Sequence, residues 1–293
     1  MSTIADNLQT LIDCKADMKA AIESKGVTVS GGLSTYADAI REIEVGQIPY
    51  DTGIRLGFSE FVSAPYFDTK SFTDMNRMFM YCTELKSAPL YNTENVTDMS
   101  YMFYECQSLT DIPLYNTSKC ANMSYMFDMC VNITSVPLFD TSRVTNMTNM
   151  FSGCSKLIQF PKFNTSNVTS MNGLIAGCTI LTSMPLLDAS NVVNINLADI
   201  SAGYIMSNTS MVDFGGFKDY GKKQNIMDVD LRNFLIPFPN LRYASIMNVI
   251  NNLYDRASAG YSILTLKLHS NHYRMLSDND IAIATNKGWT ITT

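Results

Sequence analysis

Hydrophobic and polar positions repeat along this chain with a period of 24 residues, and no insertion breaks the register from Ala64 to Asn194. Residues 136–159 read VPLFDTSRVTNMTNMFSGCSKLIQ, and the unit before them reads IPLYNTSKCANMSYMFDMCVNITS. A fixed period of this length is typical of small supersecondary units that bury their apolar faces only by stacking. The pattern therefore predicts a stack of similar units.

The hydrophobic columns of the repeat predict the structure inside each unit. Methionine recurs at two positions three residues apart and phenylalanine directly follows the second, which is the spacing of one face of a short helical turn. A leucine or isoleucine column then begins a stretch that we expect to be a strand running through a proline, and triplets such as residues 140–142 form turns. Each unit should thus hold a short strand, a turn and a short helical or 3₁₀ segment. The columns are Met75, Met99, Met123, Met147 and Met171; Met78, Met102, Met126 and Met150; Phe79, Phe103, Phe127 and Phe151; and Leu85, Leu109, Ile133, Leu157 and Leu181.

Four segments follow from this pattern: residues 1–48, 49–63, 64–199 and 200–293. The first is predicted to be helical, with apolar stripes that need a partner, and we expect it to attach the protein to a larger particle. The second is predicted to be a capping strand, the third the regular repeats, and the fourth irregular repeats with a cap. The predicted attachment residues are Leu8, Leu11, Ile12, Met18, Ile22, Tyr36 and Ile40.

The C-terminal segment changes to longer elements. Strands are expected at residues 227–231 and 263–268, and a helix at residues 244–254. Ser277 is expected to cap a helix over residues 278–286, and Gly288 to end it. Terminal repeats must seal the core, so the single tryptophan, Trp289, is predicted to pack inside this cap.

Composition and charge exclude several classes of function. The formal net charge is −6 and the pI is about 4.9, so the basic footprint of a nucleic-acid-binding protein is missing. No stretch approaches eighteen apolar residues, and the N-terminus lacks the apolar region of a secretory signal. We therefore expect neither membrane spanning nor export by an N-terminal signal.

The residues of catalysis and metal binding are sparse. Five of the seven cysteines fall 24 residues apart, from Cys82 to Cys178, which is typical of a reduced, buried column rather than of disulfides. Only two histidines occur, His269 and His272, and no third ligand accompanies them. We expect no catalytic residues, no metal site and no cofactor, and hence no enzyme.

Positions that vary between units are the expected place for partner recognition. A surface made only of repeated side chains discriminates poorly between partners, and exposed tyrosine with arginine is the usual composition of a binding hot spot. Two variable columns, beginning at Arg77 and Met80, carry tyrosines in their N-terminal half. The candidate partner-binding residues are Arg77, Tyr81, Tyr101, Tyr104 and Tyr125.

These units resemble the BspA-type leucine-rich repeats of the DUF285 group, which occur in surface proteins of gut bacteria, mycoplasma lipoproteins and gut phages. The resemblance covers about residues 52–293 and rests on PLFDTSRVTNMTNMFSGCSKL and, at the C-terminal end, DNDIAIATNKGWTIT. It implies an α/β fold, a leucine-rich-repeat solenoid with 24-residue rungs used for adhesion or partner binding. Residues 11–43 are similar to a short segment near the start of phage tail and virion appendage proteins.

Two functional hypotheses follow. The first is a bacteriophage virion appendage, in which residues 1–48 bind other virion proteins and the repeats meet a protein or glycan of the host surface. The alternative is a bacterial surface adhesin with the same repeats. An intracellular scaffold and a homo-oligomer remain open, whereas nucleic acid and membrane are not expected as partners.

Overall fold

A computed structural model of the chain describes residues 62–64, 69–193, 213–223, 229–230 and 242–293. Within these described residues, the helices and strands all lie from residue 183 onward. They are β1 (Ser183–Met184), β2 (Leu187–Asp188), β3 (Asp213–Phe214), β4 (Phe217–Lys218), β5 (Val229–Asp230), α3 (Tyr243–Asn252), β6 (Leu264–Lys267), α4 (Ser270–Tyr273), α5 (Asp278–Asn286) and β7 (Trp289–Thr292).

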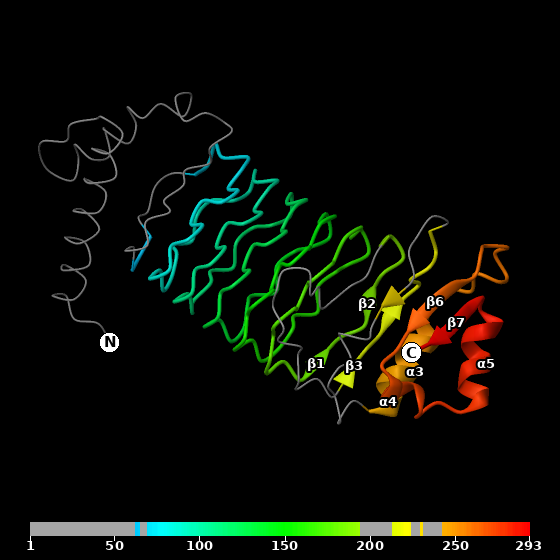
Figure 1. Ribbon diagram of the computed structural model, residues 1–293. Coiled ribbons are helices and arrows are strands. Elements are labelled where there is room, and N and C mark those ends of the chain that lie inside the picture. The colour runs from blue at the N-terminus through cyan, green and yellow to red at the C-terminus, as the bar shows by residue number, and fades with distance from the viewer. Residues whose placement is uncertain (1–61, 65–68, 194–212, 224–228, 231–241) are drawn as a thin grey trace, which may run out of the picture.

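Successive 24-residue units lie side by side, and Figure 1 shows them as parallel loops coloured from cyan to green. We call residues 64–87, 88–111, 112–135, 136–159 and 160–183 the first to fifth rungs. Isolated parallel bridges join equivalent positions of neighbouring rungs, as between Asp74 and Asp98 or between Asn122 and Asn146. Backbone pairing at the repeat spacing therefore holds each rung to the next.

The methionine and phenylalanine columns form turns, and the predicted helical segment is wrong in the described rungs. The N–H of Phe79 donates to the carbonyl of Met102 on the next rung at 2.8 Å, whereas the N–H of Met78 donates back to Met75 at 3.3 Å. This alternation continues along the segment. A left-handed residue such as Arg77, with φ of 60°, breaks the run of helical dihedrals, so an α-helix cannot propagate.

The predicted strand in each rung is also much reduced. Between residues 69 and 182 the structure has only isolated bridges, and the first named strands are β1 and β2. The proline is one cause, because the residue two positions later donates to its carbonyl, as Phe139 does to Pro137 at 3.0 Å, and this closes a tight turn. The described part of the chain thus combines short parallel strands with helices and contains no closed sheet.

The predicted core columns are buried in register. The ring centroids of Phe79 and Phe103 are 5.4 Å apart and the rings are stacked, and Phe127 follows Phe103 at 5.7 Å. The thiol of Cys106 donates to the carbonyl of Phe79 at 3.0 Å. The same thiol bond recurs on the next three rungs at 3.0–3.1 Å. All six described cysteines are buried and form no disulfide, as predicted for a buried, reduced column.

The C-terminal elements confirm most of the predicted cap. β5, β6 and β7 form a parallel three-stranded sheet, with α3 and α5 beside it at the end of the stack (Figure 1). Ser277 caps α5 through a reciprocal capping box with Asp280. Trp289 is buried, and its indole N–H donates to the carbonyl of Tyr254 at 3.0 Å. The short helix α4 was not predicted.

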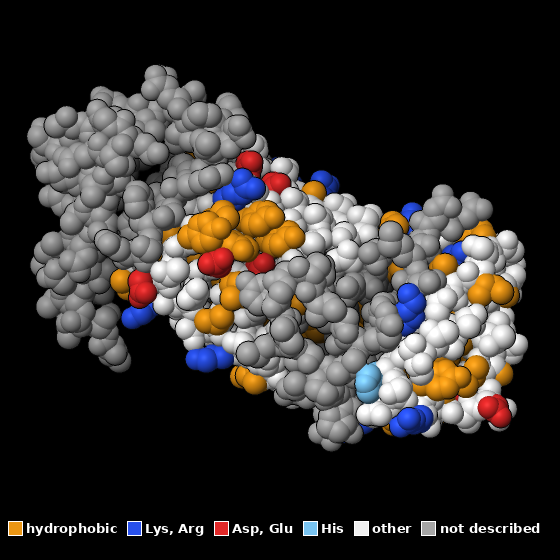
Figure 2. Space-filling view, in the orientation of Figure 1, with side chains coloured by type: hydrophobic (Ala, Val, Ile, Leu, Met, Phe, Trp, Pro, Cys, Tyr) orange, Lys and Arg blue, Asp and Glu red, His pale blue; other side chains and the backbone are white. Residues whose placement is uncertain are grey.

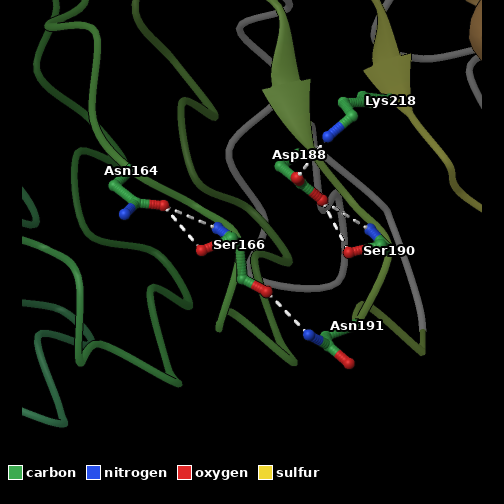
Figure 3. A network of polar contacts seen from close by, with 6 residues as sticks. All are labelled: Asn164, Ser166, Asp188, Ser190, Asn191 and Lys218. Atoms are coloured by element: carbon green, nitrogen blue, oxygen red, sulfur yellow. Dashed lines mark hydrogen bonds and ion pairs between the residues drawn. The ribbon is translucent and has the colours of Figure 1, made fainter.

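Polar turn residues connect the last rungs to this C-terminal region (Figure 3). The side-chain oxygen of Asn164 accepts hydrogen bonds from the backbone and hydroxyl of Ser166, and Asp188 does the same for Ser190. The other carboxylate oxygen of Asp188 lies 3.1 Å from Nζ of Lys218 in β4. These side chains satisfy turn backbone groups, as the sequence predicted for the polar triplets.

The predicted attachment helices in residues 1–48, nearly all of the capping strand at 49–63 and the end of the regular repeats at 194–199 lie outside the described residues. Among the described residues, no helix has the length and hydrophobicity needed to cross a membrane.

Candidate partner-binding face

The five residues predicted to bind a partner lie together on the first three rungs. The rings of Tyr101 and Tyr125 stack with centroids 4.5 Å apart, and Tyr104 lies 5.6 Å from Tyr101. Tyr81 meets Tyr104 edge to face at 5.5 Å, and the guanidinium carbon of Arg77 lies 5.2 Å from the ring centroid of Tyr101. We call these five residues the tyrosine face.

The backbone beneath the tyrosine face is held in an unfavourable conformation. Arg77, Tyr81, Tyr101 and Tyr125 have φ between 57° and 68°, in the left-handed region that side chains larger than glycine or asparagine seldom adopt. Each such residue costs on the order of 1 kcal/mol. The turn pattern requires a left-handed residue at these positions on every rung, but it does not require a tyrosine or an arginine.

The fourth and fifth rungs show which residues fit the same positions at lower cost. Asn149 and Gly153 occupy them on the fourth rung, and Gly173 and Gly177 on the fifth. Large side chains at these positions are therefore confined to the first three rungs, where most of them build the tyrosine face and the others are Glu105 and Met129. Strain that packing does not demand is an indication of function.

Two carboxylates that the sequence analysis did not select adjoin the tyrosine face. Glu105 is half-buried and left-handed, with φ of 58°, and Asp128 is 5% exposed. Burial raises the pKa of the Asp128 carboxyl to about 7, although a hydrogen bond from Ser152 opposes the shift. Burial also raises the pKa of the Tyr104 hydroxyl, and Asp128 and Glu105 add to that shift because they are negatively charged neighbours.

The sequence carried a signal for one of these acids. Asp128 is the single charged residue in a column that otherwise holds methionine, tyrosine, serine and alanine. Its side chain oxygen Oδ1 and the Nε of Arg77 are buried and have no hydrogen-bond partner. Both ends of the tyrosine face therefore hold polar atoms whose hydrogen-bonding capacity is unused.

Exposed apolar side chains also occur elsewhere on the rungs. Figure 2 shows hydrophobic side chains gathered near the N-terminal end of the described repeats, bordered by acidic and basic ones. Tyr81 is 47% exposed, and a separate column formed by Leu90, Leu114 and Leu138 is 62–63% exposed. Each leucine follows the proline of its rung, and the tight turn described above holds it outward. This leucine column is regular, so it carries less information for recognition than the tyrosine face.

The histidines hold structural positions at the C-terminal end. His269 precedes α4, and its Nδ1 accepts the N–H of Asn271 at 3.3 Å as a helix cap. His272 is buried. In the described part of the chain, no group of three or more histidine, cysteine, aspartate or glutamate side chains is arranged to hold a metal ion.

Comparison with known proteins found one family to which the repeats are similar. Residues 58–159 and 129–202 match the model of a family described as "Mycoplasma protein of unknown function, DUF285". Neither the curated proteins nor the solved structures gave a match. The phage-like similarity of residues 11–43 has no counterpart in these results. The chain is thus similar to the DUF285 family from residue 58 to residue 202.

Proposed function

We propose that this chain is a non-catalytic surface protein whose rungs form a leucine-rich-repeat-type solenoid and present the tyrosine face to a partner. The observation that carries the proposal is the placement of Arg77, Tyr81, Tyr101 and Tyr125 at left-handed positions, where later rungs have asparagine or glycine. Contact of these side chains with a partner would account for the free-energy cost of their left-handed backbone conformation. Tyrosine and arginine are also the side chains most often found at binding hot spots.

Display on a bacterial surface is the form of the proposal that the family match supports. The DUF285 match covers residues 58–202, and these repeats resemble those of bacterial surface proteins, whereas the virion hypothesis depends on residues 11–43 alone. Fractionation of producing cells tests the location. Recovery on the outer surface, sensitive to protease in intact cells, is expected, and recovery only in purified phage particles would favour the virion hypothesis instead.

The binding role is tested by changing the tyrosines without touching the core. Tyr101, Tyr104 and Tyr125 changed together to serine should weaken binding to an extract of host or epithelial surface components by about tenfold or more. A control changes Leu90, Leu114 and Leu138 to serine, because these are also three apolar side chains on the surface of the rungs and lie outside the tyrosine face.

Circular dichroism should show that both triple variants keep the wild-type fold. Loss of binding in the tyrosine variant alone supports the proposal. Loss in the leucine variant alone would move the site to the leucine column, and unchanged binding in the tyrosine variant would refute the role of the tyrosine face.

A further inference from the structure

We propose that the tyrosine face takes a cationic side chain, the ammonium or guanidinium group of a protein or peptide partner. This inference rests on the binding function proposed above and specifies the chemistry of the partner. Three observations carry it: the arrangement of the rings, the cation already stacked on one of them, and two carboxyl groups beside them that form no ion pair among the described residues.

The aromatic rings offer negative π faces to a cation. Tyr81 is 47% exposed, and Tyr101, Tyr104 and Tyr125 are half-buried, so their rings are fixed by neighbours but still reach solvent. A cation within about 6 Å of such a ring is attracted by its quadrupole, most strongly where water is partly excluded. Several rings at different angles surround a cation better than one ring does, and the tyrosine face supplies stacked, tilted and edge-to-face pairs.

The protein itself shows that these rings accept a guanidinium. Arg77 lies over the ring of Tyr101 at 5.2 Å, on the first-rung side of the tyrosine face. It makes no ion pair among the described residues. On the third-rung side, with Tyr125 and Asp128, no ion pair or cation–π contact from another described residue is present. A lysine or arginine of the partner would lie over the rings on the third-rung side, as Arg77 lies over Tyr101 on the first-rung side.

The carboxylates of Glu105 on the second rung and Asp128 on the third rung give this side of the tyrosine face negative charge. Neither Glu105 nor Asp128 forms an ion pair among the residues that the structure describes, and Oδ1 of Asp128 has no hydrogen-bond donor. Asp128 is only partly ionised near pH 7, because burial raises its pKa to about 7. The charge that it does carry is poorly screened by water, and a cation placed on the neighbouring rings would favour its ionised form. A cationic group is therefore attracted, whereas an anionic one is repelled by Glu105 and by ionised Asp128.

A short peptide of known charge provides the probe. A capped hexa-arginine peptide is titrated into the full chain, with capped hexaglutamine and hexaglutamate peptides as neutral and anionic comparisons. Wild type should bind hexa-arginine at least about tenfold more tightly than hexaglutamine, because the cation–π and charge contributions are absent for the neutral peptide.

A second experiment replaces the two carboxylates by amides of the same shape. The variant Glu105→Gln with Asp128→Asn should bind hexa-arginine about tenfold more weakly. The charge-matched control is Glu94→Gln with Asp140→Asn, which removes two exposed acids elsewhere, and asparagine already occurs at the equivalent of residue 140 on the neighbouring rungs. If the asparagine at 128 impairs folding, Asp128→Ser introduces the residue that the fourth rung has at that position.

The outcomes separate this inference from the proposed function. Weaker binding in the tyrosine-face variant but not in the control supports the inference. Equal losses in both double variants would show attraction to the overall charge of −6 and overturn it. If the surface ligand needs the tyrosines but is indifferent to Glu105 and Asp128, the binding function stands and the cationic partner is refuted.

Discussion

The first three rungs and the last two share a core but differ at the surface. Phenylalanine rings stack through both parts, and the cysteine thiols donate to the same carbonyl on each rung. At the left-handed turn positions, however, the early rungs have arginine, tyrosine, glutamate and methionine, and the later ones asparagine and glycine. Core packing therefore determines the residues at the periodic positions. At the left-handed positions, the early rungs use residues that are less favourable there than asparagine or glycine, which indicates selection for something other than packing.

The largest expected effect on stability tests whether the early and late rungs share an equivalent core. Phe103→Ala in the second rung and Phe151→Ala in the fourth should each lower the free energy of unfolding by about 3–5 kcal/mol, because both rings are fully buried between neighbours. Denaturant unfolding measures the two losses. A difference between them of more than about 2 kcal/mol would mean that the core is not equivalent along the stack.

A second prediction concerns pH and is confined to the early rungs. The pKa of the Asp128 carboxyl is raised to about 7 in the folded protein, so folding favours the protonated form. Below the unfolded pKa, near 4, Asp128 is protonated in both states and does not lower the free energy of unfolding. As the pH rises from there through 7, the unfolded state loses this proton first, so the free energy of unfolding falls. Asp128→Asn has no such titration.

Relative to wild type, Asp128→Asn should therefore gain roughly 2–4 kcal/mol in unfolding free energy between pH 4 and pH 8. Unfolding of both proteins at several pH values gives this difference, in which titrations common to both cancel. Glu105 is the charged neighbour that contributes to the raised pKa. Glu105→Gln should therefore reduce the pH dependence of wild type, and a flat difference between wild type and Asp128→Asn would show that Asp128 is ionised without penalty.

The periodic part of this fold was accessible from the sequence, and its local conformation was not. Met75, Phe79 and Cys82 recur at a fixed spacing, which predicts their burial whatever backbone carries them. The same spacing suggested a helix, because apolar residues three and four apart fit a helical face. The left-handed residue at Arg77 could not be anticipated, since arginine has no preference for that region.

The candidate site was anticipated only in part for a related reason. Tyr101 and Tyr125 stood out because they vary within a column, and the structure places their rings in contact. Asp128 and Glu105 were not selected, because burial and neighbouring charge, which give them their importance, depend on which rungs adjoin. At the C-terminal end, Ser277 and Gly288 were recognised because capping chemistry is local.

A third prediction tests the glycine that the fourth rung has at a left-handed position. Gly153→Ala should lower the free energy of unfolding by about 1–3 kcal/mol, because φ is 72° and an added Cβ would meet the Sδ of Met129 on the third rung. Gly260→Ala is the matched control, since its φ is 69° and nothing lies within 4 Å of the added atom. The control should lose only about 1 kcal/mol, and adding Met129→Ala to Gly153→Ala should relieve the steric component.

The smallest expected change in stability comes from giving an early rung the residue of a later one. Tyr125→Asn introduces the residue that the fourth rung has at the same position, Asn149. It removes a ring stack with Tyr101 that contributes about 0.5–1.5 kcal/mol, and it relieves a left-handed tyrosine that costs about as much. The free energy of unfolding should therefore change by less than about 1 kcal/mol. Binding to the surface ligand, measured on the same preparation, should nevertheless fall severalfold. A variant that is destabilised by about 3 kcal/mol or more would mean that tyrosine is at this position for packing, and the argument from strain to function would then fail.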